Sequence, residues 1–150
     1  VITKTFSKAF GLAGLRVGWA YCPKKIAEKL DILKVPFSVN TAAQMAAISA
    51  LEDDDHINFS VEHNSKWKKI LNDCFAEVGL IVYPSQCNFI LVEFLESSKF
   101  SAKDAYHLLS SKGIIVREME EYNLPNCLRI TIGKEEANLL LIETVNAFKK

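Results

Sequence analysis

The 150-residue sequence lacks a long apolar run, an excess of charge of one sign and any clustering of cysteines. No apolar stretch approaches the roughly 20 residues that a membrane-spanning helix needs, and the N-terminus lacks the charged-then-apolar pattern of a signal peptide. Eighteen basic residues balance eighteen acidic ones, which argues against a general nucleic-acid or membrane-surface footprint. With 49% apolar and 24% charged residues, the composition is that of an ordinary globular protein of one or two small domains.

The sequence also lacks the cysteine and histidine spacings of disulfide frameworks and metal sites. The four cysteines stand apart, without a C-x-x-C pair, at Cys22, Cys74, Cys87 and Cys127. This pattern predicts reduced, apolar cysteines in a cytoplasmic protein. His56 and His63 fall on one predicted helix face, but no third ligand follows at a metal-like spacing, so we expect structural or surface roles and no metal.

In the first part of the chain, hydrophobic periodicity predicts two strands and three helices. The strands are expected at 1–5 and 16–22, and the helices at 23–34, 41–52 and 56–78. Pro23 suits a first helical turn, the acidic run 52–55 suits the start of the third helix, and Gly79 suits its end. The helix 41–52 is apolar nearly all round, which predicts burial on more than one side.

After residue 80 the pattern changes to short strands and two helices, summarised as β-α-β-β-α. Strand-like pieces at 80–94 surround a Pro-Ser turn, a Ser-x-x-Asp capping pattern opens a helix at 101–113, and the last helix spans 134–149. Its first turn is acidic and two lysines follow at its end, which matches the helix dipole. This order predicts a small α+β unit, whereas the first part predicts a fragment of an α/β layer.

The stretch "KTFSKAFGLAGLRVGW" combines an amine, two hydroxyls and a guanidinium in Lys8, Thr5, Ser7 and Arg16. A lysine held away from water or near cations becomes a nucleophile toward carbonyls, and an arginine binds phosphate with two hydrogen bonds. These groups suit a carbonyl-bearing cofactor that also carries a phosphate, such as pyridoxal phosphate. A solvated basic turn fits the same residues, whereas a Walker-type loop does not, because the glycines follow the lysine.

The segment "TFSKAFGLAGLRVGW" resembles the cofactor-lysine segment of the fold-type I pyridoxal-phosphate aminotransferases, in particular the histidinol-phosphate aminotransferase branch. The family pattern is Ser/Thr-x-Ser-Lys, a turn of small residues, and Leu-Arg-x-Gly followed by an aromatic residue. The resemblance implies that Lys8 is the catalytic residue and binds the cofactor covalently. It also implies that Thr5, Ser7 and Arg16 contact the cofactor phosphate.

The resemblance continues through "SQCNFILVEF", "GIIVREM" and "NCLRITIG" near the end of the chain. It implies that Arg129 binds the α-carboxylate of the substrate and that Arg117 meets a substrate phosphate. By pattern alone, each arginine alternates with apolar neighbours and fits a solvated face of a sheet. For Asn88 we expect a turn or a buried hydrogen bond.

The resemblance implies a homodimer that transfers an amino group from histidinol phosphate to 2-oxoglutarate in histidine biosynthesis. The alternatives are another class I/II aminotransferase of the aromatic or aspartate type, a phosphothreonine decarboxylase-like enzyme, or a non-catalytic α+β interaction domain. Because the family lysine lies in the second half of the chain, we expect a C-terminal portion that is inactive alone. Its expected parts are a large-domain remnant (1–55), a linking helix (56–79) and a small C-terminal domain (80–150).

Overall fold

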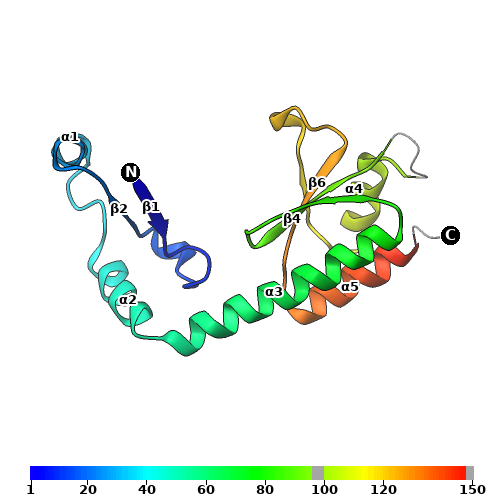
Figure 1. Cartoon of the computed structure of the whole chain (residues 1–150), viewed down its shortest axis with the longest axis horizontal. Coiled ribbons are helices and arrows are strands. Elements are labelled where there is room, and N and C mark those ends of the chain that lie inside the picture. Colours follow the sequence, from blue (N-terminus) through cyan, green and yellow to red (C-terminus); the bar gives the residue numbers. More distant parts are fainter. Residues whose placement is uncertain (96–99, 148–150) are drawn as a thin grey trace. The chain divides into compact units, whose positions relative to one another are not determined.

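The computed structural model describes residues 1–95 and 100–147, and it confirms a mixed α/β protein (Figure 1). The chain divides into two compact units, residues 1–62 (unit 1) and 63–150 (unit 2). The division falls inside one long helix. Within the described ranges, no helix is long and apolar enough to cross a membrane. The lysines predicted at the end of the last helix, Lys149 and Lys150, lie outside the described residues.

Unit 1 contains one pair of strands and three α-helical segments in the order expected from the sequence, with an additional 3-10 turn between the strands. Its elements are β1 (Ile2–Thr5), the 3-10 turn η1 (Ala13–Leu15), β2 (Gly18–Tyr21), α1 (Lys24–Leu33), α2 (Thr41–Leu51) and the first turns of α3 (Asp54–Glu77). β1 and β2 pair antiparallel, so the segment between them forms a loop that returns to the same end of the pair.

Polar side chains start α2 and α3, as helix capping requires. The side chain of Asn40 accepts a hydrogen bond of 2.8 Å from the amide of Ala43. The Asp53 carboxylate accepts one of 2.9 Å from the amide of His56. The acidic run therefore begins the third helix, as its position in the sequence predicted.

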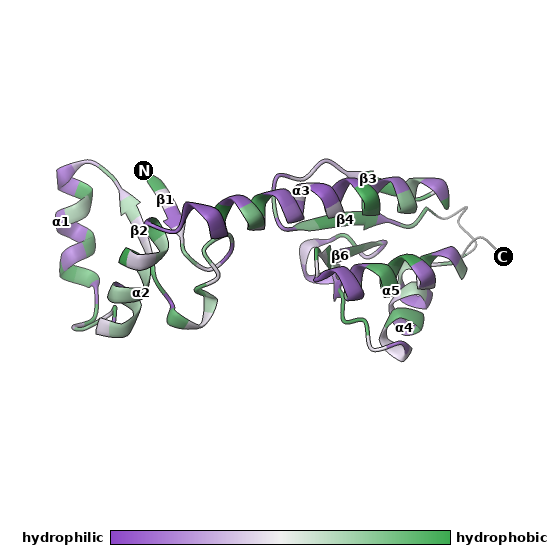
Figure 2. Cartoon of the chain, turned by 90° about the horizontal axis from the view of Figure 1, so that it is seen from below, coloured by the Kyte–Doolittle hydropathy of each residue, from purple (hydrophilic) through white to green (hydrophobic). Residues whose placement is uncertain are grey.

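Helix α2 departs from the expectation that it is buried on more than one side. Only Ala43 and Ala47 are buried, whereas Met45, Ile48 and Leu51 are each exposed by more than half, at 60%, 55% and 59%. In Figure 2 the α2 ribbon is mostly pale to green, while α1 carries purple segments. A two-stranded sheet offers too little apolar surface to cover a helix that is apolar all round.

Unit 2 is built on a four-stranded antiparallel sheet in the order β3-β4-β6-β5. Its elements after α3 are β3 (Ile81–Tyr83), β4 (Phe89–Glu93), α4 (Ala102–Ser111), β5 (Arg117–Glu118), the 3-10 turn η2 (Glu120–Tyr122), β6 (Cys127–Thr131) and α5 (Glu135–Asn146). The strand β5, which lies within the segment "GIIVREM", is only two residues long.

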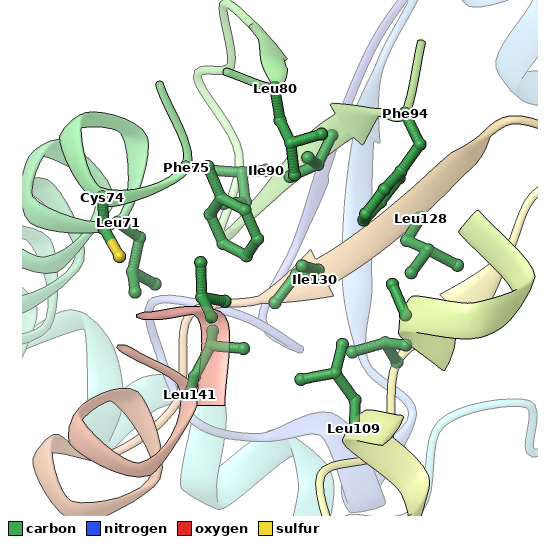
Figure 3. Close-up of a cluster of buried hydrophobic side chains, with 14 of the residues drawn as sticks. Leu71, Cys74, Phe75, Leu80, Ile90, Phe94, Leu109, Leu128, Ile130 and Leu141 are labelled. Atoms are coloured by element: carbon green, nitrogen blue, oxygen red, sulfur yellow. The ribbon is translucent and has the colours of Figure 1, made fainter. Parts of the chain in front are cut away.

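The core of unit 2 lies against one face of this sheet. Alternate residues of β4 and β6 are buried there, and the three helices α3, α4 and α5 supply the apolar side chains that cover them. Figure 3 shows the labelled members of this cluster converging on the sheet: Leu71, Cys74, Phe75, Leu80, Ile90, Phe94, Leu109, Leu128, Ile130 and Leu141. Because side chains alternate along a strand, the residues between these positions point to the opposite face.

Local signals set the ends of the helices in unit 2. Ser101 and Asp104 form a reciprocal capping box at the start of α4. Gly79 and Gly113 follow α3 and α4 with φ values of +81° and +77°, in the left-handed region that glycine adopts without strain. These four positions agree with the sequence predictions.

Candidate functional site

The loop between β1 and β2, residues 6–17, carries the lysine that the sequence singled out; we call it the lysine loop. The amide of Ser7 donates a hydrogen bond of 3.0 Å to the Thr5 hydroxyl, and the amide of Gly11 donates one of 2.9 Å to the Lys8 carbonyl. Gly11 has a φ of +72°, which favours glycine at this turn. Two short turns therefore flank Lys8, whose own side chain is exposed.

Phe6 anchors the lysine loop within unit 1. Its side chain is only 4% exposed, and its ring centroid lies 4.6 Å from that of Phe10. Its amide donates to the Val17 carbonyl at 3.2 Å, and its carbonyl accepts from the Leu12 amide at 2.9 Å. The buried Phe6 ring and its two backbone hydrogen bonds hold the backbone of the lysine loop two residues before Lys8.

Arg16 ends η1 in a left-handed conformation, with φ 55° and ψ 51°. One of its Nη1 hydrogens is donated to the Ala13 carbonyl at 2.7 Å. A guanidinium has five N–H donors, so this bond orients the side chain and leaves donors for an anion. Ser7, Lys8 and Arg16 thus lie in the lysine loop, directly after Thr5 at the end of β1.

Arg117 and Arg129 lie opposite each other on the neighbouring strands β5 and β6. Paired residues in an antiparallel ladder point to the same face, and here that face is the one opposite the helical core. Like charges placed directly opposite are unfavourable unless other groups compensate them. The environments of the two guanidinium groups therefore decide what the pair can do.

Arg117 is compensated within its own segment. Its Nη2 lies 3.2 Å from Glu121 Oε2, and its Cζ lies 5.2 Å from the centroid of the Tyr122 ring. The side chain is 43% exposed, so this ion pair is a surface one that a stronger anionic ligand can replace.

Arg129 is half-buried and has no carboxylate within ion-pair distance among the described residues. Its Nε is buried and has no hydrogen-bond partner in the same part of the chain. The Cζ atom lies 5.0 Å from the centroid of the Phe89 ring. Sequence reasoning did not identify Phe89, although its place in an alternating strand next to β6 was the available signal.

The same face of the sheet carries a tyrosine–glutamate pair. The Tyr83 hydroxyl donates a hydrogen bond of 2.5 Å to Glu93 Oε2, and this bond with the glutamate charge raises the pKa of Tyr83. Cys127 lies opposite Glu93, and burial raises the pKa of its thiol. The sequence analysis did not assign Tyr83, Glu93 or Cys127 a role in the site.

For Asn88 a turn or a buried hydrogen bond was expected. Its backbone carbonyl accepts a hydrogen bond of 2.9 Å from the amide of Ile132.

Comparison with known proteins matches nearly the whole chain to one protein family. The family described as "Aminotransferase class I and II" matches residues 1–145. The chain is 42% identical over 148 residues to the histidinol-phosphate aminotransferase of Rhodopseudomonas palustris (strain BisB18), covering 99% of this chain and 40% of that protein. It is 44% identical over 150 residues to the histidinol-phosphate aminotransferase of Maricaulis maris (strain MCS10), covering 100% of this chain and 41% of that protein.

A solved structure resembles the fold over nearly the whole chain. The histidinol-phosphate aminotransferase from Sinorhizobium meliloti, in complex with pyridoxal-5'-phosphate, matches with a TM-score of 0.74 at 25% identity. The match covers 97% of this chain and 40% of that one. The chain therefore spans about 40% of the length of the relatives that it matches.

Proposed function

The chain belongs to the class I and II aminotransferase family, and we propose that it carries the cofactor lysine and substrate arginines of a histidinol-phosphate:2-oxoglutarate aminotransferase. The observation that carries this proposal is the lysine loop. Ser7, Lys8 and Arg16 lie on this loop directly after Thr5, and hydrogen bonds within the segment shape the backbone around them. The identity of 42% and 44% to proteins of that name supports the choice of substrate.

For the organisation of the chain, we keep the division that the sequence suggests. Residues 1–55 belong to a large cofactor-binding domain, residues 56–79 form a linking helix, and residues 80–150 form a small C-terminal α+β domain. The exposed apolar side of α2 supports this proposal, since a large domain would supply further layers to cover it.

Pyridoxal phosphate fits the donors of the lysine loop. The Thr5 hydroxyl accepts the Ser7 amide and keeps its own hydrogen for a phosphate oxygen. Ser7 adds a second hydroxyl. Arg16 donates one N–H to the Ala13 carbonyl, and its other N–H groups remain as donors for the phosphate. Thr5, Ser7 and Arg16 would therefore hold the phosphate, and the exposed amine of Lys8 would hold the aldehyde carbon.

When bound, this cofactor supplies a carbonyl for the substrate amine and a ring that withdraws electrons from the substrate Cα. Nζ of Lys8 would be released from the aldehyde carbon by the incoming substrate amine. It would then take the proton from the substrate Cα as general base and deliver it, as general acid, to the former aldehyde carbon. Arg16 and the two hydroxyls would keep the cofactor phosphate in place throughout both half-reactions.

The two arginines of unit 2 bind different anionic groups of the substrates. Arg129, which has no acidic partner among the described residues, binds the α-carboxylate of the amino acid or 2-oxo acid. Arg117, whose exposed pair with Glu121 is replaceable, binds the phosphate of histidinol phosphate. An aspartate- or aromatic-type substrate has no phosphate, so Arg117 is the residue that separates those alternatives. Cytoplasmic location and homodimer assembly stay predictions.

Borohydride trapping with pyridoxal phosphate tests the lysine assignment on this chain. We expect preferential labelling of Lys8 over the exposed Lys4, located by peptide mass spectrometry, because Arg16 and the hydroxyls hold the phosphate near Lys8. Replacing Arg16 with Gln should reduce the labelling of Lys8 alone. Equal labelling of both lysines, unchanged by Arg16→Gln, would contradict the proposal.

A further inference from the structure

Arg129 is a cation on the face of the unit 2 sheet opposite the helical core, and it lacks an acidic partner among the described residues. A free arginine side chain samples many rotamers, and ordering it costs binding free energy when a ligand arrives. A guanidinium held in place beforehand avoids that cost. A hydrogen bond does not hold the Arg129 guanidinium through Nε, since this buried atom has no hydrogen-bond partner in the described ranges. Another contact must therefore restrict the side chain.

The neighbouring strand β4 supplies a large side chain at the right register. Leu91 lies directly opposite Arg129, and Phe89 lies opposite Thr131. Phe89 and Arg129 are therefore diagonal neighbours on one face, a separation that an aromatic ring spans. The Cζ atom of Arg129 lies 5.0 Å from the ring centroid of Phe89, within the range of a cation–π interaction.

This contact differs from the one at the neighbouring arginine. Arg117 also stands over a ring, that of Tyr122 at 5.2 Å, but it is additionally paired with the Glu121 carboxylate. At Arg129 the Phe89 ring restricts the guanidinium but does not neutralise its positive charge, as a carboxylate would. An aromatic face attracts the cation while the in-plane N–H groups stay available as donors.

We infer that Phe89 is a positioning residue: its ring holds the Arg129 guanidinium in place, ready for a carboxylate ligand. The part of this inference that concerns the carboxylate rests on the proposed function. The part that concerns the order of Arg129 depends only on the contact between these two side chains.

The test follows the side chain of Arg129 directly in the 150-residue chain. The sequence has three arginines, at positions 16, 117 and 129, so three Nε–H signals are assignable in a nitrogen-correlated NMR spectrum. Exchange of each Nε–H with water is measured in the wild type, Phe89→Leu and Phe89→Tyr. Tyr122→Leu is the matched control, because it removes the ring under Arg117 and leaves that under Arg129. 2-Oxoglutarate is then titrated against sodium chloride of equal ionic strength.

In Phe89→Leu we expect faster exchange at Arg129 alone and an apparent Kd for 2-oxoglutarate raised about two- to fivefold. Phe89→Tyr should restore both, and Tyr122→Leu should affect Arg117 instead. Unchanged exchange at Arg129 in Phe89→Leu overturns the inference. If the wild-type Arg129 does not respond to 2-oxoglutarate, the carboxylate role in the proposed function fails, and the exchange rates still decide the role of Phe89.

Discussion

Asn138 binds both backbone polar groups of Gly133. The Gly133 amide donates to Asn138 Oδ1 at 2.9 Å, and Asn138 Nδ2 donates to the Gly133 carbonyl at 2.9 Å. His63 Nε2 donates to the same carbonyl at 2.9 Å, because a carbonyl can only accept. Asn138 is 1% exposed. This clamp fixes the turn between α5 and β6, the strand that carries Arg129.

Replacing Asn138 with Ala should lower the free energy of unfolding by about 2 to 4 kcal/mol, because buried backbone groups lose their partner. Urea denaturation followed by circular dichroism measures this loss. Asn146→Ala, at the exposed end of the same helix, is the control and should change stability by less than about 0.5 kcal/mol. Similar losses in the two variants would show that the clamp contributes little.

Gly18→Ala should disturb the base of the lysine loop. A Cβ at Gly18 would lie 2.6 Å from the Lys4 carbonyl oxygen, so the backbone of β1 must shift. We expect faster hydrogen exchange at the Phe6 amide, which bonds to Val17 beside this position. Gly14→Ala is the control, since its Cβ would meet nothing within 4 Å. Equal exchange at Phe6 in the two variants would contradict the prediction.

The start of α4 should weaken in acid. Hydrogen bonds from the Ser101 hydroxyl and amide lower the pKa of Asp104. A carboxylate with a depressed folded-state pKa stabilises the fold above its unfolded value of about 3.9, and this contribution disappears as the pH falls further. Asp104→Asn should therefore be less stable than wild type at pH 7 and nearly equal to it at pH 2. Asp73→Asn, on the exposed side of α3, is the control. A stability gap that stays constant with pH would refute the prediction.

The chain should self-associate through α2, because Met45, Ile48 and Leu51 are exposed on it. Ile48→Lys should shift the sedimentation coefficient toward that of a single chain. Lys29→Glu on α1 changes charge without changing an apolar surface and should leave the association unchanged. A monomeric wild type at tens of micromolar would contradict the prediction.

Short-range chemistry explains where sequence reasoning agreed with the structure. The capping box of Ser101 and Asp104 and the left-handed Gly79 act within a few residues, so their effect is visible in the sequence. Longer-range expectations agreed less well. Helix α2, expected to be buried on more than one side, leaves Met45 60% exposed, because burial depends on what packs against each side of a helix.

The order of the elements and the grouping of Lys8 with its hydroxyls and Arg16 were determined by the sequence itself, since they lie within one local segment. The contact of Phe89 with Arg129, the placement of Arg117 opposite Arg129 and the clamp of Asn138 were decided only by the tertiary structure. These contacts depend on strand register and helix docking, which are set by the burial of a shared core rather than by the residues' own neighbours in the chain.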